Sequence, residues 1–145
     1  MRKSYLHLFG YTAVIAVAAT VAIAQTPGPV AVPLDTEQSF GAVDVVCTGI
    51  GESRNDVRWK AYPIRVEASN AAGDLLANVA ISLSKVTGAP LATVSCEGPW
   101  IMLRAAAGAY RFDAWMPGET LKHQTGAFNL PARGQRIVSI RFPAS

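Results

Sequence analysis

Apolar and polar residues alternate along much of the chain after position 43, in short runs that turn residues separate. The clearest alternating runs lie at 64–68, 79–84, 110–115 and 138–142. A period of two is typical of a strand with one face buried and the other in water. Shorter or weaker apolar runs that predict further strands lie at 43–47, 91–96, 100–103 and 121–130.

Turn residues separate these runs, and the helical period is almost absent. Gly73 closes one turn, and Pro117–Gly118 forms another. About seven strands, spaced by short turns, predict an all-β fold, an antiparallel β-sandwich. The polar stretch 52–60 predicts one or two helical turns or a loop. Inward-facing positions of the strands predict a core of Val79, Ile81, Leu83, Tyr110, Phe112, Val138 and Ile140.

The first 24 residues have the pattern of a secretory signal peptide. Arg2 and Lys3 carry the only charges there, an apolar stretch follows, and the segment ends in Ala22-Ile23-Ala24. An uncleaved membrane anchor is the alternative, because 5–24 is just long enough to span a bilayer. The small residues before Gln25 favour cleavage. We therefore expect a periplasmic or secreted protein, which touches a membrane only if the signal stays attached.

The segment 25–42 contains three prolines and two glycines without a sustained period, which predicts a flexible linker. The remaining stretch, 43–145, has the length of a single β-sandwich domain with its own core. Removing Arg2 and Lys3 with the signal lowers the formal charge from +3 to +1. Such a balance provides no electrostatic footprint for nucleic acid.

Two cysteines remain in the mature chain, Cys47 and Cys96. An exported protein meets an oxidising environment, so a disulfide between them is favoured over a pair of buried thiols. Trp59 lies close in sequence to Cys47, and it is expected to pin the preceding segment onto the sandwich. We therefore predict that 43–61 forms an N-terminal extension stapled to the domain.

The mature chain offers little for catalysis. His123 is its one histidine, and it lies in a polar stretch beside Lys122, where a solvent-exposed ring is expected. No nucleophile elbow is present. With the cysteines paired, His123 lacks the partners that a zinc site needs. Neither a calcium loop nor a phosphate-binding glycine loop is evident. We predict no catalytic residues, no metal and no cofactor.

Trp115 is the strongest candidate for contact with a ligand or partner. It falls on the opposite face of its run from Tyr110, beside Arg111 and Asp113. An at least partly exposed tryptophan flanked by charges can stack on a sugar or anchor a protein partner. The alternative is a tryptophan covered by the N-terminal segment or a loop. Trp100, directly after Gly98–Pro99, is expected in core or edge packing.

Three segments resemble the carboxypeptidase regulatory-like domain, a transthyretin-like sandwich found in small secreted bacterial proteins. They are Gly73-Asp74-Leu75-Leu76-Ala77-Asn78-Val79-Ala80-Ile81-Ser82-Leu83, Glu97-Gly98-Pro99-Trp100-Ile101-Met102-Leu103 and Gly108-Ala109-Tyr110-Arg111-Phe112. The chain departs from that pattern at 105–107, where three alanines replace the family's Leu-Pro-Pro.

The resemblance implies an accessory domain without catalytic residues, and the broader fold includes carbohydrate-binding modules. We expect a non-catalytic exported β-sandwich that acts as an envelope accessory or protein-interaction module, with an unknown protein partner in the cell envelope. The alternative is a module that binds carbohydrate, a glycan, or a small ligand through exposed aromatic residues. Trp115, Arg111 and Asp113 are then the contact residues.

Overall fold

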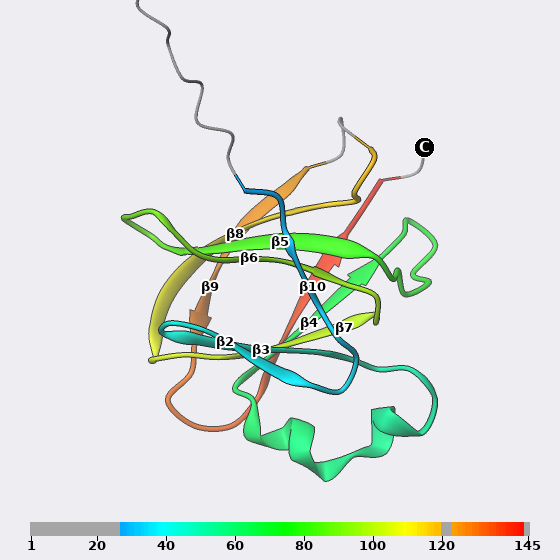
Figure 1. Ribbon diagram of the computed structural model, residues 1–145, viewed down its shortest axis with the longest axis horizontal. Helices are drawn as coiled ribbons and strands as arrows, with labels where there is room; N and C mark the ends of the chain where they lie inside the picture. Colours follow the sequence, from blue (N-terminus) through cyan, green and yellow to red (C-terminus); the bar gives the residue numbers. More distant parts are fainter. Residues whose placement is uncertain (1–26, 120–122, 144–145) are drawn as a thin grey trace, which may run out of the picture.

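The computed structural model of the protein describes residues 27–119 and 123–143, which form two packed β-sheets (Figure 1). The signal-like segment 1–24 lies outside the described residues. The strands are β1 (Val30–Val32), β2 (Glu37–Phe40), β3 (Val43–Thr48), β4 (Ile64–Ser69), β5 (Val79–Lys85), β6 (Pro90–Cys96), β7 (Trp100–Arg104), β8 (Gly108–Trp115), β9 (Gln124–Leu130) and β10 (Arg136–Arg141). Two short 3-10 helices, η1 (Gly51–Asn55) and η2 (Val57–Ala61), occupy the polar stretch for which helical turns or a loop were expected.

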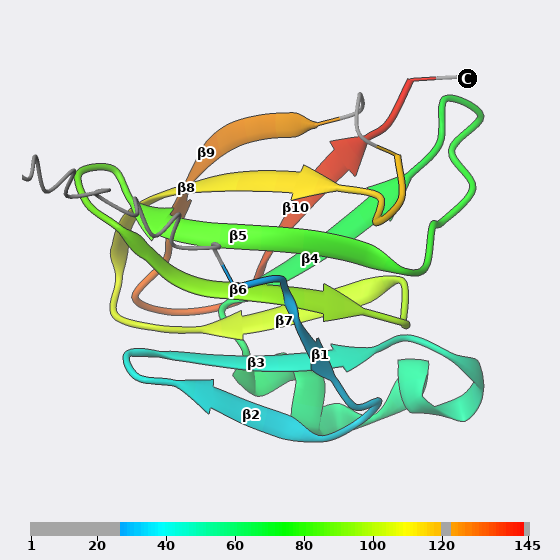
Figure 2. The ribbon, with the colours of Figure 1, turned by 45° about the horizontal axis from the view of Figure 1, so that its top comes forward.

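Each sheet has five strands. The first sheet has the order β1-β6-β5-β8-β9, and the second has the order β10-β4-β7-β3-β2. Figure 2 shows β4 and β10 passing behind β5 and β8. The all-β prediction is confirmed, but the sheets are mixed, because β1 runs parallel to β6 and β10 runs parallel to β4. The prediction of purely antiparallel sheets is therefore wrong at one edge of each sheet.

The segment predicted as a flexible linker contributes two strands. β1 pairs with β6, β2 pairs with β3, and Val32 is buried between the sheets. Pro29 and Pro33 flank β1 without breaking it, because an edge strand needs ladder hydrogen bonds on one side only. The linker prediction is wrong for this part of 25–42. These two strands also raise the number in the described residues above the predicted seven or so.

The core lies between the sheets and contains most of the predicted residues. Five of the seven are buried, namely Val79, Ile81, Leu83, Tyr110 and Ile140. Phe112 and Val138 are only partly buried and pack against that core. Phe112 faces Gly126 on the neighbouring strand, and glycine has no side chain to cover the ring. Val138 lies on the edge strand β10, where one flank lacks a neighbouring strand.

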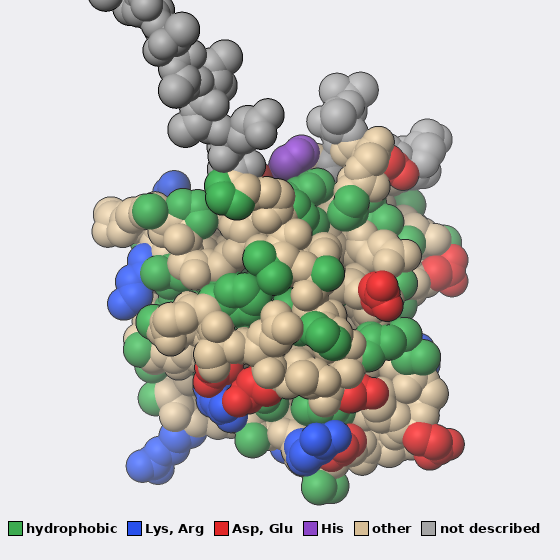
Figure 3. Space-filling view, viewed as in Figure 1, with side chains coloured by type: hydrophobic (Ala, Val, Ile, Leu, Met, Phe, Trp, Pro, Cys, Tyr) green, Lys and Arg blue, Asp and Glu red, His purple; other side chains and the backbone are tan. Residues whose placement is uncertain are grey.

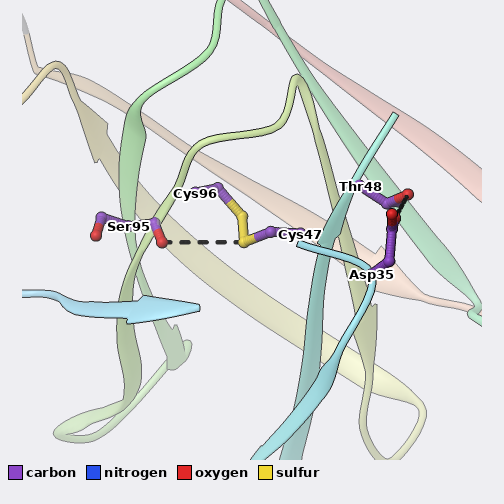
Figure 4. The surroundings of a disulfide bond; sticks show 5 residues. All are labelled: Asp35, Cys47, Thr48, Ser95 and Cys96. Atoms are coloured by element: carbon purple, nitrogen blue, oxygen red, sulfur yellow. Dashed lines mark hydrogen bonds between the residues drawn. A yellow bond between two sulfur atoms is a disulfide. The ribbon is translucent and has the colours of Figure 1, made fainter. Parts of the chain in front are cut away.

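The predicted disulfide between Cys47 and Cys96 is confirmed (Figure 4). Cys47 lies on β3 in one sheet and Cys96 on β6 in the other, with both side chains buried. Residues 43–48 are therefore not an extension, because β3 lies inside its sheet between β7 and β2. Within 49–61, Trp59 packs on the outer face of that sheet against Val46 and Met102. Among the described residues, no helix is long and apolar enough to cross a membrane.

Candidate functional site

The outer surface of β5, β8 and β9 forms a hydrogen-bonding surface that we call the polar face. Strand register places Ser82, Asp113 and Thr125 side by side across the three strands. The next row contains Ser84 and Arg111. The surface is hollowed here by about 590 Å³. The residues that line the hollow are Ser82, Ser84, Arg111, Phe112, Asp113, Thr125, Gly126 and Ala127.

The alternation of the sequence produces this face directly. Ile81 and Leu83 point into the core, so the serines between them point outward. Tyr110 points inward in the same way, which turns Arg111 to the outside of β8. Both β5 and β8 have hydrogen-bonded neighbours on either side. The middle of the face therefore presents side chains to a ligand, because the backbones of β5 and β8 are already paired.

At one end of the polar face, three side chains form a stacked and hydrogen-bonded group. The rings of Trp115 and His123 lie 5.3 Å apart between centroids and only 14° from parallel. The Nδ1 atom of His123 lies 2.8 Å from a carboxylate oxygen of Asp113. Both polar side chains remain more than two-fifths exposed, at 47% for His123 and 43% for Asp113. The group thus sits at the surface, within reach of a ligand.

Trp115 is neither fully exposed nor fully covered. Trp115 is partly exposed, as its position in the alternation predicts, and one side of the indole is covered by a ring from beyond the Pro117–Gly118 turn. His123 is exposed, also as expected, but it is not simply surrounded by solvent, because Asp113 and Trp115 hold it in place. The alternation in the sequence predicted that Trp115, Arg111 and Asp113 share one face. Nothing in the sequence indicated that His123 contacts two of them.

Arg111 differs from the other charged residues of the polar face. Its side chain is exposed and lines the hollow, yet it forms no ion pair with any residue in 27–119 or 123–143. Asp113, its neighbour on the same strand, is bound to His123 instead. Ser82 shares a hydrogen bond of 3.0 Å with Thr93 on β6. The hollow therefore combines several hydroxyl groups with a cation that pairs with no carboxylate in the described part of the chain.

A second polar cluster, on the outer face of the other sheet, surrounds Arg104. The guanidinium contacts Glu37 at 2.6 Å and Asp44 at 3.1 Å, and it lies 4.9 Å from the centre of the Tyr62 ring. The Tyr62 hydroxyl donates a hydrogen bond to Glu37. Burial, with this hydrogen bond to a carboxylate, raises the pKa of Tyr62 to about 12.

The Arg104 cluster functions as a clamp across three strands. Glu37 lies on β2, Asp44 on β3 and Arg104 on β7, so the ion pairs tie the edge strand to the middle of the sheet. Charged side chains gather where β2, β3 and the 3-10 helices lie (Figure 3). A concavity of about 340 Å³ lies beside the clamp. Because Arg104 is already matched by two carboxylates, we assign this cluster a structural role.

The described residues also limit what metal chemistry the site supports. Asp113 and His123 supply two potential ligands, whereas a zinc site takes three or four from the protein. Within the described ranges, no group of three or more histidine, cysteine, aspartate or glutamate residues comes together. The arrangement is suited to hydrogen bonding, stacking and attraction of an anion.

Comparisons with known proteins do not assign the chain to a family. No protein-family model matches it, and no curated protein matches it. The fold and the site therefore define its class. It is an all-β domain of two mixed sheets, joined by a disulfide and bearing one open polar face.

Proposed function

We propose that this protein is a non-catalytic β-sandwich module that acts in the cell envelope or the medium and binds its partner through the polar face. The observation that carries the proposal is the hollow on this face, where Arg111, which has no ion-pair partner among the described residues, lies beside hydroxyl groups. Binding sites commonly place a few polar groups in a concave surface to orient a ligand. Trp115 adds a partly exposed aromatic ring on the same face.

Two features support a location outside the cytoplasm. The first 24 residues have the pattern of a cleaved signal, and the chain contains a disulfide. Disulfides persist in oxidising compartments and are rare in the cytosol. We propose a periplasmic or secreted protein on these grounds.

We also propose kinship with the carboxypeptidase regulatory-like domains. The three segments that resemble this family fall on β5, β7 and β8 and on the turns before them. Gly108 begins β8 with a φ of 146°, a conformation that side chains disfavour, and this explains a glycine at that point of the motif. An accessory role without catalysis is what this kinship implies.

The surroundings of His123 favour binding over catalysis. A histidine held by an aspartate is the arrangement that a hydrolase uses as a general base. Here the ring lies flat against Trp115, and among the described residues no hydroxyl or thiol group hydrogen-bonds to it. Because Asp113 and Trp115 hold the ring at the exposed end of the polar face, we assign the pair to ligand contact.

The proposal is tested by site-directed cross-linking in the native envelope fraction. A benzophenone amino acid replaces Ala127, which is exposed in the hollow, and in a matched control it replaces Ser139, which is exposed on the outer side of the other sheet. Benzophenone inserts into C–H bonds of proteins and saccharides alike. We expect adducts from position 127 and none from position 139. Equal labelling at both positions, or none at 127, contradicts a binding role for the polar face.

A further inference from the structure

Resting on the proposed function, we infer that the ligand of the polar face is an acidic saccharide. In this arrangement Arg111 binds the carboxylate of a uronic acid unit, and the nearby hydroxyl groups bind the hydroxyls of the sugar. Four observations lead to this ligand class: the exposed cation in the hollow, the hydroxyl groups around it, the partly exposed indole of Trp115 and the paired backbones of β5 and β8.

The guanidinium group of Arg111 favours a ligand that carries a negative charge. Arg111 is exposed in the hollow without an ion-pair partner in the described part of the chain. The nearest carboxylate along the strand, Asp113, contacts His123 at 2.8 Å and forms no ion pair with Arg111 within the described residues. A guanidinium group binds a carboxylate through two parallel hydrogen bonds, which a neutral hydroxyl cannot form. An anionic group on the ligand is the complement of this site.

The remaining groups match a sugar ring. Ser82, Ser84 and Thr125 present hydroxyls, each of which both donates and accepts hydrogen bonds, as saccharide hydroxyls do. Trp115 lies two residues beyond Asp113 on the same face of β8, about 7 Å further along the strand. Its indole offers an apolar surface with a polar edge. A ligand longer than one sugar unit can therefore reach from Arg111 to Trp115.

The same face is poorly suited to a protein partner. A peptide cannot add as a strand at the middle of the face, because β5 and β8 already pair on both sides, and only the outer edge of β9 is open to such an addition. Protein interfaces have apolar or aromatic residues near their centre. The centre of this hollow holds serine, threonine and charged residues, while Ala127 and the partly buried Phe112 are its apolar members. Nucleic acid is also a poor match, since tight binding to phosphates needs many cations and the described residues that line the hollow include one, Arg111.

The test is direct binding of the mature protein to oligogalacturonate and to its methyl ester, measured by isothermal titration calorimetry. We expect the acid form to bind at least tenfold more tightly than the ester. Arg111→Gln should abolish this preference, while Arg111→Lys should keep part of it, because lysine retains the charge and loses the two-pronged geometry. Arg141→Gln is the matched control, an exposed arginine on β10 of the other sheet, and should bind as the wild type does.

The possible results separate this inference from the proposed function. Equal binding of acid and ester, or equal loss in the Arg111→Gln and Arg141→Gln variants, overturns the acidic saccharide. Absence of saccharide binding, combined with protein adducts from position 127, also overturns it while the proposed binding role of the face stands. Absence of adducts at position 127 overturns both. Circular dichroism of each variant establishes that the fold is intact.

Discussion

Cys47 and Cys96 connect the two sheets through a buried disulfide, although 49 positions separate them in sequence. Their Cα atoms lie 5.4 Å apart, one on β3 and the other on β6. Without this bond, the two sheets are held together mainly by apolar side chains between them. The disulfide therefore keeps two segments close together in the unfolded chain that are distant in sequence and that belong to different sheets in the fold.

Loss of this disulfide should destabilise the protein strongly and leave the polar face untouched. A closed loop of this length contributes about 4 kcal/mol in the chain-entropy account. We expect Cys47→Ala combined with Cys96→Ala to lower the free energy of unfolding by about 3–4 kcal/mol, as measured by urea denaturation. Reductant should lower the midpoint of the wild type and leave the double variant unchanged. A loss below about 1 kcal/mol would show that sheet packing alone sets the stability.

The sequence predicted the longer strands because their faces differ in environment. In β4, β5 and β8, inward residues are apolar and most outward residues are polar, so the alternation is visible without a structure. β1 and β2 have three and four residues, too few for a period to be recognised. The parallel pairing of β10 with β4 depends on how the chain crosses between sheets, which no local pattern encodes.

Tyr62 should make the protein sensitive to strong alkali. Its pKa of about 12 lies above the ordinary value of 10, so folding favours the protonated phenol. The stabilisation is fully present below pH 10 and is lost as the pH rises towards 12. Across this interval, we expect the free energy of unfolding to fall by roughly 2–3 kcal/mol more in the wild type than in Tyr62→Phe. Parallel urea titrations from pH 9 to 12 measure the difference, and identical slopes for both proteins would refute it.

Asp44 should make the stability of the protein fall at acid pH, whereas Tyr62 makes it fall at alkaline pH. Its pKa is lowered, first by the hydrogen bond from Ser39 at 2.5 Å and then by Arg104. The stabilisation is therefore present above the ordinary carboxyl pKa of about 4 and is lost as the pH falls through the lowered value. At pH 7 we expect Asp44→Asn to be less stable by under about 1 kcal/mol, since the pair is near the surface. The gap in melting temperature between the two proteins should close by pH 2, and a constant gap would contradict the assignment.

Only part of the candidate site could be predicted from the sequence, because the rest depends on how the strands are ordered in the sheet. Alternation alone places Arg111, Asp113 and Trp115 on one face of one strand, and the structure does bring them there. The contribution of Ser82 and Thr125 depends on which strands flank β8, and that order is a property of the whole fold. The Arg104 clamp was missed because its three charged members lie on strands whose register could not be inferred.

Gly126 should be intolerant of any side chain, because the Phe112 ring occupies the space beside it. A Cβ atom at position 126 would lie 2.6 Å from the Cε1 and Cζ atoms of Phe112, well inside contact distance. The ring must therefore move, and overpacking of this kind costs about 1–3 kcal/mol. We expect Gly126→Ala to lower the free energy of unfolding by this amount in urea denaturation.

Two further variants distinguish a clash with a ring from a clash with the backbone. Adding Phe112→Leu to Gly126→Ala should recover much of the lost stability relative to Phe112→Leu alone, because the smaller side chain frees the space. At Gly98, a Cβ atom would lie 2.3 Å from the backbone oxygen of Thr48, which cannot turn aside. Gly98→Ala should therefore cost more than Gly126→Ala. If alanine at position 126 is as damaging with leucine at 112 as with phenylalanine, the ring is not the cause.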